Sequence, residues 1–301
     1  MTKPKLVFIG RQYHSKTKSD QMILSLLEDH FEIDLLRREQ YTDRELVVAI
    51  NQSQPSVVFF WCLPPSTTKH LWKIKCKNTV WAPMWDGFKP LKFRKRMLIT
   101  SSKLKVLCFS RALYNYFATT RIPCRYWQCA LKPNFKRFEN KPPYVLFLWQ
   151  REALINLDNV VKLIGEQNIK KILYKSEIGD FPHRNYSFEI EKLKDWMSDT
   201  DYQAKIEEAD FYIAPRRTEG IGFSFLEAMS HGKVVLAYNE STMNEYLIEG
   251  ENGYLFDEHF QLKGLLKSPQ SLSKRMEEIA NKAYENWEQT KHKIVPFLLE
   301  K

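Results

Sequence analysis

Short apolar segments alternate with amphipathic segments along most of the chain, and this alternation constrains the fold more than any other feature of the sequence. Residues 6–9 read LVFI, a run of strand length, and residues 21–30 then space their apolar side chains along one face of a helix. Strands separated by helices are typical of βαβ units, which build parallel sheets. Further strand candidates are residues 33–36, 57–61, 80–84 and 106–110, and helix candidates between them are residues 43–53 and 111–120.

A polar stretch with prolines, residues 131–143, interrupts this alternation and is interpreted as a linker. The alternation then resumes, with strand candidates at 144–149, 171–174, 211–214 and 234–237 and helix candidates at 157–167, 202–209 and from 271 onward. The predicted fold class is α/β, with two doubly wound Rossmann-like domains facing a cleft, residues 1–135 and 136–301. The last helical segment could cross back onto the first domain. Ligands of such sheets bind at the carboxyl ends of the strands.

Composition supports a folded chain with a substantial core. Of the 301 residues, 44% are hydrophobic and 14% aromatic, which argues against general disorder. No run of eighteen apolar residues is present to span a membrane, and the apolar run near the N-terminus is too short for a signal peptide. The cysteines form no C-x-x-C pair and are expected to be reduced core thiols of a cytoplasmic protein, with metal binding as the less favoured alternative. They are Cys62, Cys76, Cys108, Cys124 and Cys129.

The net charge of +10 is concentrated in one stretch of the chain. Residues 87–138 contain thirteen lysines and arginines and no acidic residue. Such asymmetry predicts an anionic partner: a membrane surface, a nucleic acid or a phosphorylated substrate. Within it, Lys92, Arg94, Lys95 and Arg96 alternate with apolar residues, as in an interfacial membrane segment or at an acceptor site. The same pattern also fits apolar core residues beneath a solvated basic face.

The segment that bears most directly on function is residues 216–232, RRTEGIGFSFLEAMSHG. A strand should end at Pro215, and the two glycines that follow allow a loop whose backbone approaches a ligand closely. Ser224 is predicted to cap the next helix, with Glu227 at capping-box spacing. Exposed amides at residues 221–225 and the positive helix end would then form an anion site suited to a diphosphate. Glu227 could instead be only a capping residue, and Glu219 a solvated loop residue.

The pair Glu219-x7-Glu227, followed by Glu245 and GENGYLF at residues 250–256, resembles the nucleotide-sugar glycosyltransferases of the GT-B fold, in particular family 4. The resemblance is specific over residues 201–257. It implies transfer of a sugar from a nucleoside-diphosphate sugar to an acceptor hydroxyl, with retention at the anomeric carbon. It implies no cofactor besides the donor substrate and no metal site. The first domain would face the acceptor and the second would bind the nucleotide sugar.

The resemblance also implies roles for individual residues. Glu227 would hold the ribose hydroxyls of the nucleotide, and Glu219 would act near the reacting carbon of the donor sugar. The diphosphate would lie on the backbone amides of Gly220, Ile221, Gly222, Phe223 and Ser224.

This chain departs from the family in its basic pair. The family places Gly-Arg, and shortly afterwards Lys, after the first strand of the second domain. Here Arg151 fits the arginine, Gln150 replaces the glycine, and no lysine occurs before Lys162. Arg216 or Arg217 could supply the missing charge, because a guanidinium binds phosphate bidentately.

In the first domain, the family uses a loop after the first strand, which here contains Gly10. It often has a His-Asp pair after the fourth strand, but Trp85 stands at the histidine position and only Asp86 remains. Asp86 could polarise an acceptor hydroxyl or hold the donor sugar, or it could be only the first residue of an Asp-Gly turn. His14 is a further candidate.

Asp199-Thr200-Asp201 has the D-x-D pattern of a metal site but is interpreted as a helix cap, so no metal ligand is predicted. The preferred function is glycosyl transfer in cell-surface or lipid-linked glycan synthesis, by a cytoplasmic protein peripheral to the inner face of the membrane. Two alternatives stay open: a nucleic-acid base glycosyltransferase, with aromatic residues such as Trp127 interleaved in the basic segment, and a catalytically degenerate binding protein. The sequence indicates neither the oligomeric state nor the donor and acceptor.

Overall fold

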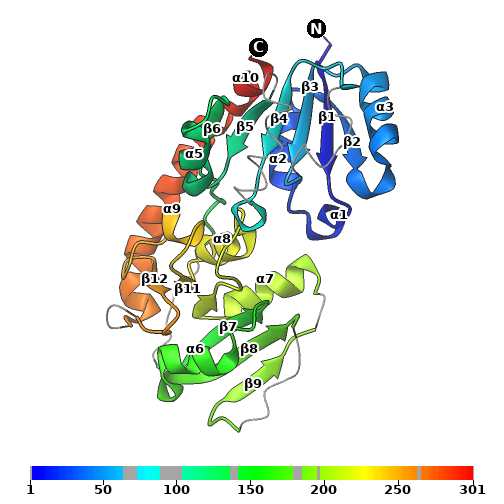
Figure 1. Ribbon diagram of the computed structural model, residues 1–301. Helices are drawn as coiled ribbons and strands as arrows, with labels where there is room; N and C mark the ends of the chain where they lie inside the picture. The colour runs from blue at the N-terminus through cyan, green and yellow to red at the C-terminus, as the bar shows by residue number, and fades with distance from the viewer. Residues whose placement is uncertain are drawn as a thin grey trace. The chain divides into compact units, whose positions relative to one another are not determined.

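The computed structural model describes residues 2–63, 73–88, 104–135, 142–178, 185–194, 197–262 and 266–300. The chain divides into two compact units (Figure 1). The first contains Met1–Cys129 and Trp287–Lys301, and the second contains Ala130–Asn286. The unit boundary lies just before the predicted linker, and the C-terminal segment returns to the first unit.

The first unit is a six-stranded parallel sheet in the order β2-β1-β3-β4-β5-β6. Its strands are β1 (Lys5–Gly10), β2 (Glu32–Arg37), β3 (Val57–Trp61), β4 (Thr79–Ala82), β5 (Leu104–Cys108) and β6 (Cys124–Tyr126). Its helices are α1 (His14–Thr17), α2 (Gln21–Glu28), α3 (Asp43–Ser53) and α5 (Arg111–Ala118), with 3₁₀ turns η1 (Arg38–Gln40) and η4 (Trp85–Gly87).

Central strands of this sheet are buried on both faces, which explains their continuous apolar sequences. On one face, alternate side chains such as Val58 and Phe60 pack with Leu46 and Ile50 of α3. Helix α3 begins with a complete capping box in which Thr42 and Glu45 satisfy each other's backbone amides.

The second unit repeats the architecture, with strand order β12-β11-β10-β7-β8-β9 and all pairs parallel. Its strands are β7 (Tyr144–Gln150), β8 (Ile169–Ser176), β9 (Glu189–Lys192), β10 (Phe211–Ile213), β11 (Val234–Tyr238) and β12 (Gly253–Phe256). Its helical segments are α6 (Leu157–Ile164), α7 (Asp199–Glu208), α8 (Phe223–Ser230), η5 (Glu166–Asn168) and η6 (Met243–Glu245), with α9 (Pro269–Lys291) continuing into the first unit.

Helices cover both faces of this second sheet. Leu146 and Leu148 of β7 point into a core shared with α6 and with Leu272 of α9. The alternate residue Phe147 points to the other face, where its ring centroid lies 5.6 Å from that of Tyr202 in α7. The predicted class, two doubly wound α/β units with parallel sheets, is therefore confirmed.

Each sheet has a switch point, where the chain reverses the direction in which it adds strands. The switch lies between β1 and β3 in the first unit and between β7 and β10 in the second. Ligands of open α/β sheets bind beside the carboxyl ends of the strands at such points. In the second unit, the loops after β7 and β10 thus lie where a ligand is expected to bind.

Three described strands were not predicted. β6 and β12 are only three and four residues long, and β9 reads EIEK, a largely polar sequence. All three lie at sheet edges, where fewer apolar contacts are needed. Among the described residues, no helix has the length and apolar character needed to cross a membrane.

The basic residues Lys92, Arg94, Lys95 and Arg96 lie outside the described residues.

Helix α10 (Ile294–Leu299) packs beside β5 in the first unit (Figure 1). Lys105 of β5 is buried and donates hydrogen bonds from Nζ to the carbonyl oxygens of Phe297 and Glu300, both at 2.6 Å. These bonds satisfy carbonyl groups that the end of a helix leaves without intrahelical partners. Lys105 therefore ties the C-terminal helix to the first sheet.

Candidate functional site

The loop after β10 enters α8 through Gly222, which differs from the predicted start of this helix. Gly222 is the N-cap, with φ +80° and ψ +48°, and no side chain caps the helix. A Cβ at this position would lie 1.9 Å from the ring of Phe225, so both the backbone dihedrals and the packing require glycine. The predicted capping box between Ser224 and Glu227 is wrong, because the helix begins one residue before Ser224. The first amides of α8 thus receive no side-chain cap.

Thr242 holds the start of this loop from the neighbouring segment. Its side chain is fully buried, and its hydroxyl lies 2.6 Å from the carbonyl oxygen of Glu219 and 2.9 Å from that of Gly220. The loop backbone is therefore fixed at the residue that precedes the glycine pair.

Glu227 lies in the second turn of α8 with its carboxylate half-buried. Burial, with a smaller contribution from the negative charge of Asp199, raises the pKa of Glu227 to about 7. Within the described ranges, no side chain or amide hydrogen bonds to this carboxylate. A desolvated acceptor with no partner is costly in a folded protein unless a ligand supplies donors.

A row of hydroxyl groups lies near the two glutamates. The hydroxyl oxygens of Tyr202 and Tyr212 are 3.4 Å apart, and Ser224 hydrogen bonds to Tyr212. Burial raises the pKa of Tyr212, and the charges of Glu227 and Glu219 raise it further. Both carboxylates therefore lie in the electrostatic neighbourhood of one buried hydroxyl, and Glu219 itself is 8% exposed.

Arg151 follows β7 and joins this group at the switch point. Its guanidinium lies 4.7 Å from the ring centroid of Trp149, and its Nε donates to Oε2 of Glu177 at 2.9 Å. The charges of Arg151 and Glu227 both act on the hydroxyl of Tyr202. The structure thus brings together Arg151, Glu219, Glu227 and the loop of Gly220, Ile221, Gly222, Phe223 and Ser224, from the ends of β7 and β10.

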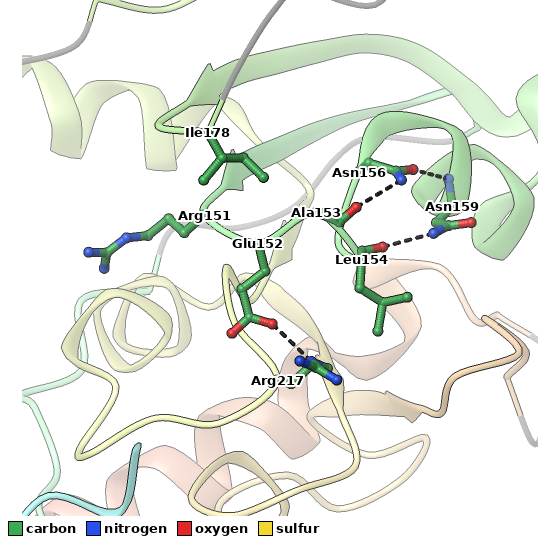
Figure 2. A pocket seen from close by; sticks show the side chains of 8 residues that line it. All are labelled: Arg151, Glu152, Ala153, Leu154, Asn156, Asn159, Ile178 and Arg217. Carbon is green, nitrogen blue, oxygen red and sulfur yellow. Dashed lines mark hydrogen bonds and ion pairs between the residues drawn. The ribbon is translucent and has the colours of Figure 1, made fainter. Parts of the chain in front are cut away.

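Arg151 also lines a pocket of about 740 Å³ beside the start of α6 (Figure 2). Asn156 caps α6 by accepting a hydrogen bond from the amide of Asn159. Arg217, on the same pocket, donates from Nε to Glu152 at 3.0 Å. In Figure 2, Arg151 extends away from both asparagines, whereas Glu152 turns toward Arg217.

Gly10 and Asp86 belong to the first unit, at the carboxyl ends of β1 and β4. A Cβ at Gly10 would lie 2.8 Å from Nη1 of Arg37, so side chains of its own unit fill the space around this glycine. Asp86 lies in η4, close enough to Cys62 for its charge to add to burial in raising the pKa of that thiol.

The fully buried His14 lies beside Cys62, with Nε2 3.8 Å from the sulfur. Its Nδ1 accepts a hydrogen bond from the amide of Arg11, so the hydrogen of the neutral ring resides on Nε2. Burial lowers the pKa of His14 to about 4, which keeps the ring neutral near pH 7.

The D-x-D sequence begins α7. Ser198, one residue earlier, is the N-cap and accepts a hydrogen bond from the amide of Asp201. No group of three or more potential His, Cys, Asp or Glu metal ligands occurs in the described parts of the chain. The five cysteines are free. Cys108 and Cys129 are buried as predicted, but Cys62, Cys76 and Cys124 are only partly buried, so the prediction of core thiols is wrong for these three.

Within GENGYLF, Asn252 has a structural role. Its side chain is buried, donates to the carbonyl oxygen of Tyr246 and accepts from the amide of Ile248. These bonds shape the turn that leads into β12.

Sequence reasoning missed Trp149, Lys175, Glu177 and Thr242. Trp149, Lys175 and Glu177 lie at the ends of β7 and β8, where the strand-end rule could have directed attention to them. Nothing local marks Thr242, whose contacts reach back more than twenty residues to the glycine loop.

Comparison with known proteins shows which family and which folds this chain resembles. Residues 192–289 match the family "Glycosyl transferases group 1". No curated protein matches the sequence.

Among solved structures, the sucrose-phosphate synthase of Thermosynechococcus elongatus is similar, with a TM-score of 0.70 at 12% identity over 98% of both chains. HepE of Anabaena, solved with UDP and glucose, has a TM-score of 0.56 at 11% identity over 98% of this chain and 99% of its own. The lipopolysaccharide outer core galactosyltransferase WaaB has a TM-score of 0.60 at 12% identity over 95% of this chain and 99% of its own. The chain therefore has the GT-B fold, and residues 192–289 are similar to the glycosyltransferase group 1 family.

Proposed function

We propose that the protein transfers a sugar from a nucleoside-diphosphate sugar to an acceptor hydroxyl, with retention at the anomeric carbon and without a resident metal ion. The observation that carries the proposal is the half-buried carboxylate of Glu227, which no described residue hydrogen bonds, beside the uncapped start of α8. A carboxylate can accept hydrogen bonds from both hydroxyls of a ribose diol. The UDP in the solved structure of HepE supports a nucleotide ligand for this fold.

The proposed roles follow the geometry of the second unit. Glu227 binds the ribose, and the amides of the glycine loop with Arg151 bind the diphosphate. Glu219 acts near the reacting carbon, and the hydroxyl of Thr242 holds its backbone carbonyl group. As the bond between the anomeric carbon and the phosphate oxygen breaks, negative charge builds on the leaving diphosphate. Backbone amides and a guanidinium fixed in advance stabilise such charge most effectively.

The acceptor side of the reaction is assigned to the first unit. There Gly10 ends β1 at the switch point between β1 and β3, and Asp86 lies in η4, which follows β4. We assign Asp86 to polarising the acceptor hydroxyl. We place the reaction in cell-surface or lipid-linked glycan synthesis, with residues 87–138 docking a cytoplasmic protein on an anionic membrane. The sequence alone motivates that part of the proposal.

Donor binding is tested with a panel of nucleotide sugars and nucleoside diphosphates. A ligand that binds only the native state raises the melting temperature. Glu227→Ala should weaken binding of the best ligand by roughly tenfold to a hundredfold, the equivalent of about 1.5–3 kcal/mol for a charge-assisted hydrogen bond. Unchanged affinity in this variant would contradict the ribose role.

Glu219→Gln should lower turnover more than donor affinity, because a group near the reacting carbon acts mainly in the transition state. The test measures kcat for donor hydrolysis or transfer and Kd for the donor, in the wild type and in the variant. Equal losses of both would make Glu219 a ground-state binding residue, and no loss would remove it from the site.

A further inference from the structure

Arg151 is held in a single orientation by two neighbours from different strands. Nε donates to one carboxylate oxygen of Glu177, and the guanidinium plane lies over the indole of Trp149. The indole nitrogen of Trp149 donates to the other oxygen of the same carboxylate at 3.1 Å. Glu177 thus uses one oxygen for the arginine and one for the ring against which the arginine lies.

Trp149 is itself held by neighbouring side chains from α7 and β8. Its ring meets Tyr202 of α7 edge-on, with centroids 6.4 Å apart. Trp149 is paired in the sheet with Lys175 of β8, whose Nζ lies 4.3 Å from the indole centroid. The cations of Arg151 and Lys175 thus both lie against one indole, whose nitrogen hydrogen bonds to Glu177.

The terminal nitrogens of the Arg151 guanidinium are available to a ligand. Of the five N–H donors of arginine, Nε supplies one, and the terminal nitrogens carry the rest. Among the described residues, neither terminal nitrogen of Arg151 makes a hydrogen bond, and Nε bonds only to Glu177. Two terminal nitrogens in a fixed plane match the geometry of a phosphate group.

Stability does not explain this arrangement. The side chain of Glu177 is 41% exposed and that of Arg151 26%, and exposed ion pairs contribute little to folding. No lysine or arginine stands between Arg151 and Lys162, so a phosphate bound at the end of β7 depends more heavily on Arg151 being oriented.

We propose that Glu177 and Trp149 are positioning residues that fix the terminal nitrogens of Arg151 for the donor diphosphate, with Lys175 supplying the second positive charge. This inference rests on the proposed function and deepens it, because it assigns the diphosphate, and not the base or ribose, to this group.

The test measures affinities of UDP, GDP and ADP and of the matching nucleosides by calorimetry, the nucleosides by competition where they bind weakly. The comparison uses the nucleoside diphosphate that binds most tightly and its matching nucleoside. Arg151→Ala and Glu177→Gln should each lower the affinity for this diphosphate, by roughly tenfold or more for the arginine variant. Both should leave nucleoside affinity unchanged. The double variant should bind as Arg151→Ala does, because Glu177 acts through the arginine.

The matched control is Glu251→Gln. Glu251 also accepts from an arginine Nε, that of Arg275 at 2.6 Å, in the same unit. It should not change either affinity. Trp149→Phe keeps a ring under the guanidinium but removes the bond to Glu177, and is expected to fall between the wild type and Glu177→Gln.

Three outcomes would overturn the inference: diphosphate affinity unchanged in Glu177→Gln, equal losses for diphosphate and nucleoside, or additive losses in the double variant. If Glu227→Ala still weakens the nucleoside in these cases, the proposed function stands and only this inference fails. If the wild type binds none of the diphosphates, both fail.

Discussion

At the scale of single residues, Glu227 combines two properties that a purely structural carboxylate would not need. It is half-buried, and its pKa is raised from 4.5 to about 7. Near neutral pH the unliganded protein therefore holds both protonation forms of this group. A diol that donates two hydrogen bonds favours the carboxylate form, so ligand binding should be linked to loss of the proton.

The affinity of a nucleoside diphosphate should accordingly rise between pH 6 and pH 8 in the wild type, relative to Glu227→Gln. Ionisation of the ligand's own phosphate is common to both proteins and cancels in the comparison. Stability of the unliganded protein should change in the opposite direction. A raised folded-state pKa contributes stability below about pH 4.5 that is lost as the pH rises through about 7.

Calorimetric titrations and thermal unfolding of both proteins across this pH range provide the measurement. Parallel affinity profiles for the wild type and Glu227→Gln would show that the ligand does not contact this carboxylate.

At the scale of secondary-structure elements, the tie between Lys105 and α10 makes a prediction about the C-terminal segment. Burial lowers the pKa of Lys105 from 10.5 to about 8. Between about pH 8 and pH 10.5 the unfolded chain therefore holds the proton of Lys105 more tightly than the folded protein does. The free energy of unfolding rises with pH over this interval, and the gain is lost when the pH falls back to about 8. The wild type should therefore gain stability over this interval relative to Lys105→Met.

At pH 7 the Lys105→Met variant should unfold more easily, by about 1–3 kcal/mol, because buried carbonyl groups at the end of α10 lose their partners. Hydrogen exchange should quicken in α10 before it does in the central strands. Unchanged protection of α10 would show that Phe297 and its apolar neighbours hold this helix without the lysine.

The elements also show how much the sequence could predict. Strands such as β3, with five consecutive buried apolar residues, and helices such as α3, with an intact capping box, can be recognised locally. β9 gains its stability from pairing with β8, and its own sequence hardly indicates a strand. The start of α8 was misplaced because a serine is the more common cap, whereas here the ring of Phe225 packs over Gly222.

In the candidate site, too, some residues could be recognised from the local sequence and others only from the fold. The E-x7-E spacing lies within one loop and helix, so a linear motif could reveal Glu219 and Glu227. Glu177 and Thr242 act through contacts between strands that are distant in sequence, and only the three-dimensional fold brings them to the site.

At the scale of the whole molecule, the chain separates its positive charge from its candidate donor site. The acid-free stretch at residues 87–138 lies mostly in the first unit, whereas the glutamate pair and Arg151 lie in the second. A chain organised in this way could bind an anionic surface with one unit and a nucleotide with the other, so each property should be removable without the other.

The last prediction tests that separation. Changing Lys92, Arg94, Lys95 and Arg96 together to serine should abolish co-sedimentation with anionic lipid vesicles at low salt. Each basic residue near an anionic leaflet contributes about 1 kcal/mol, so four together account for a large share of reversible attachment. Neutral vesicles should bind neither protein, and hydrolysis of the soluble donor should be the same in both.

A matched control removes the same number of charges from exposed lysines of the second unit. These are Lys170, Lys194, Lys274 and Lys282. If the control loses vesicle binding as fully as the first variant does, the attraction comes from net charge and not from residues 92–96. If the wild type binds an oligonucleotide in direct competition with vesicles, the anionic partner is a nucleic acid. If it binds neither, the basic segment serves a soluble anionic acceptor, and loss of transfer with unchanged donor hydrolysis in the first variant would show it.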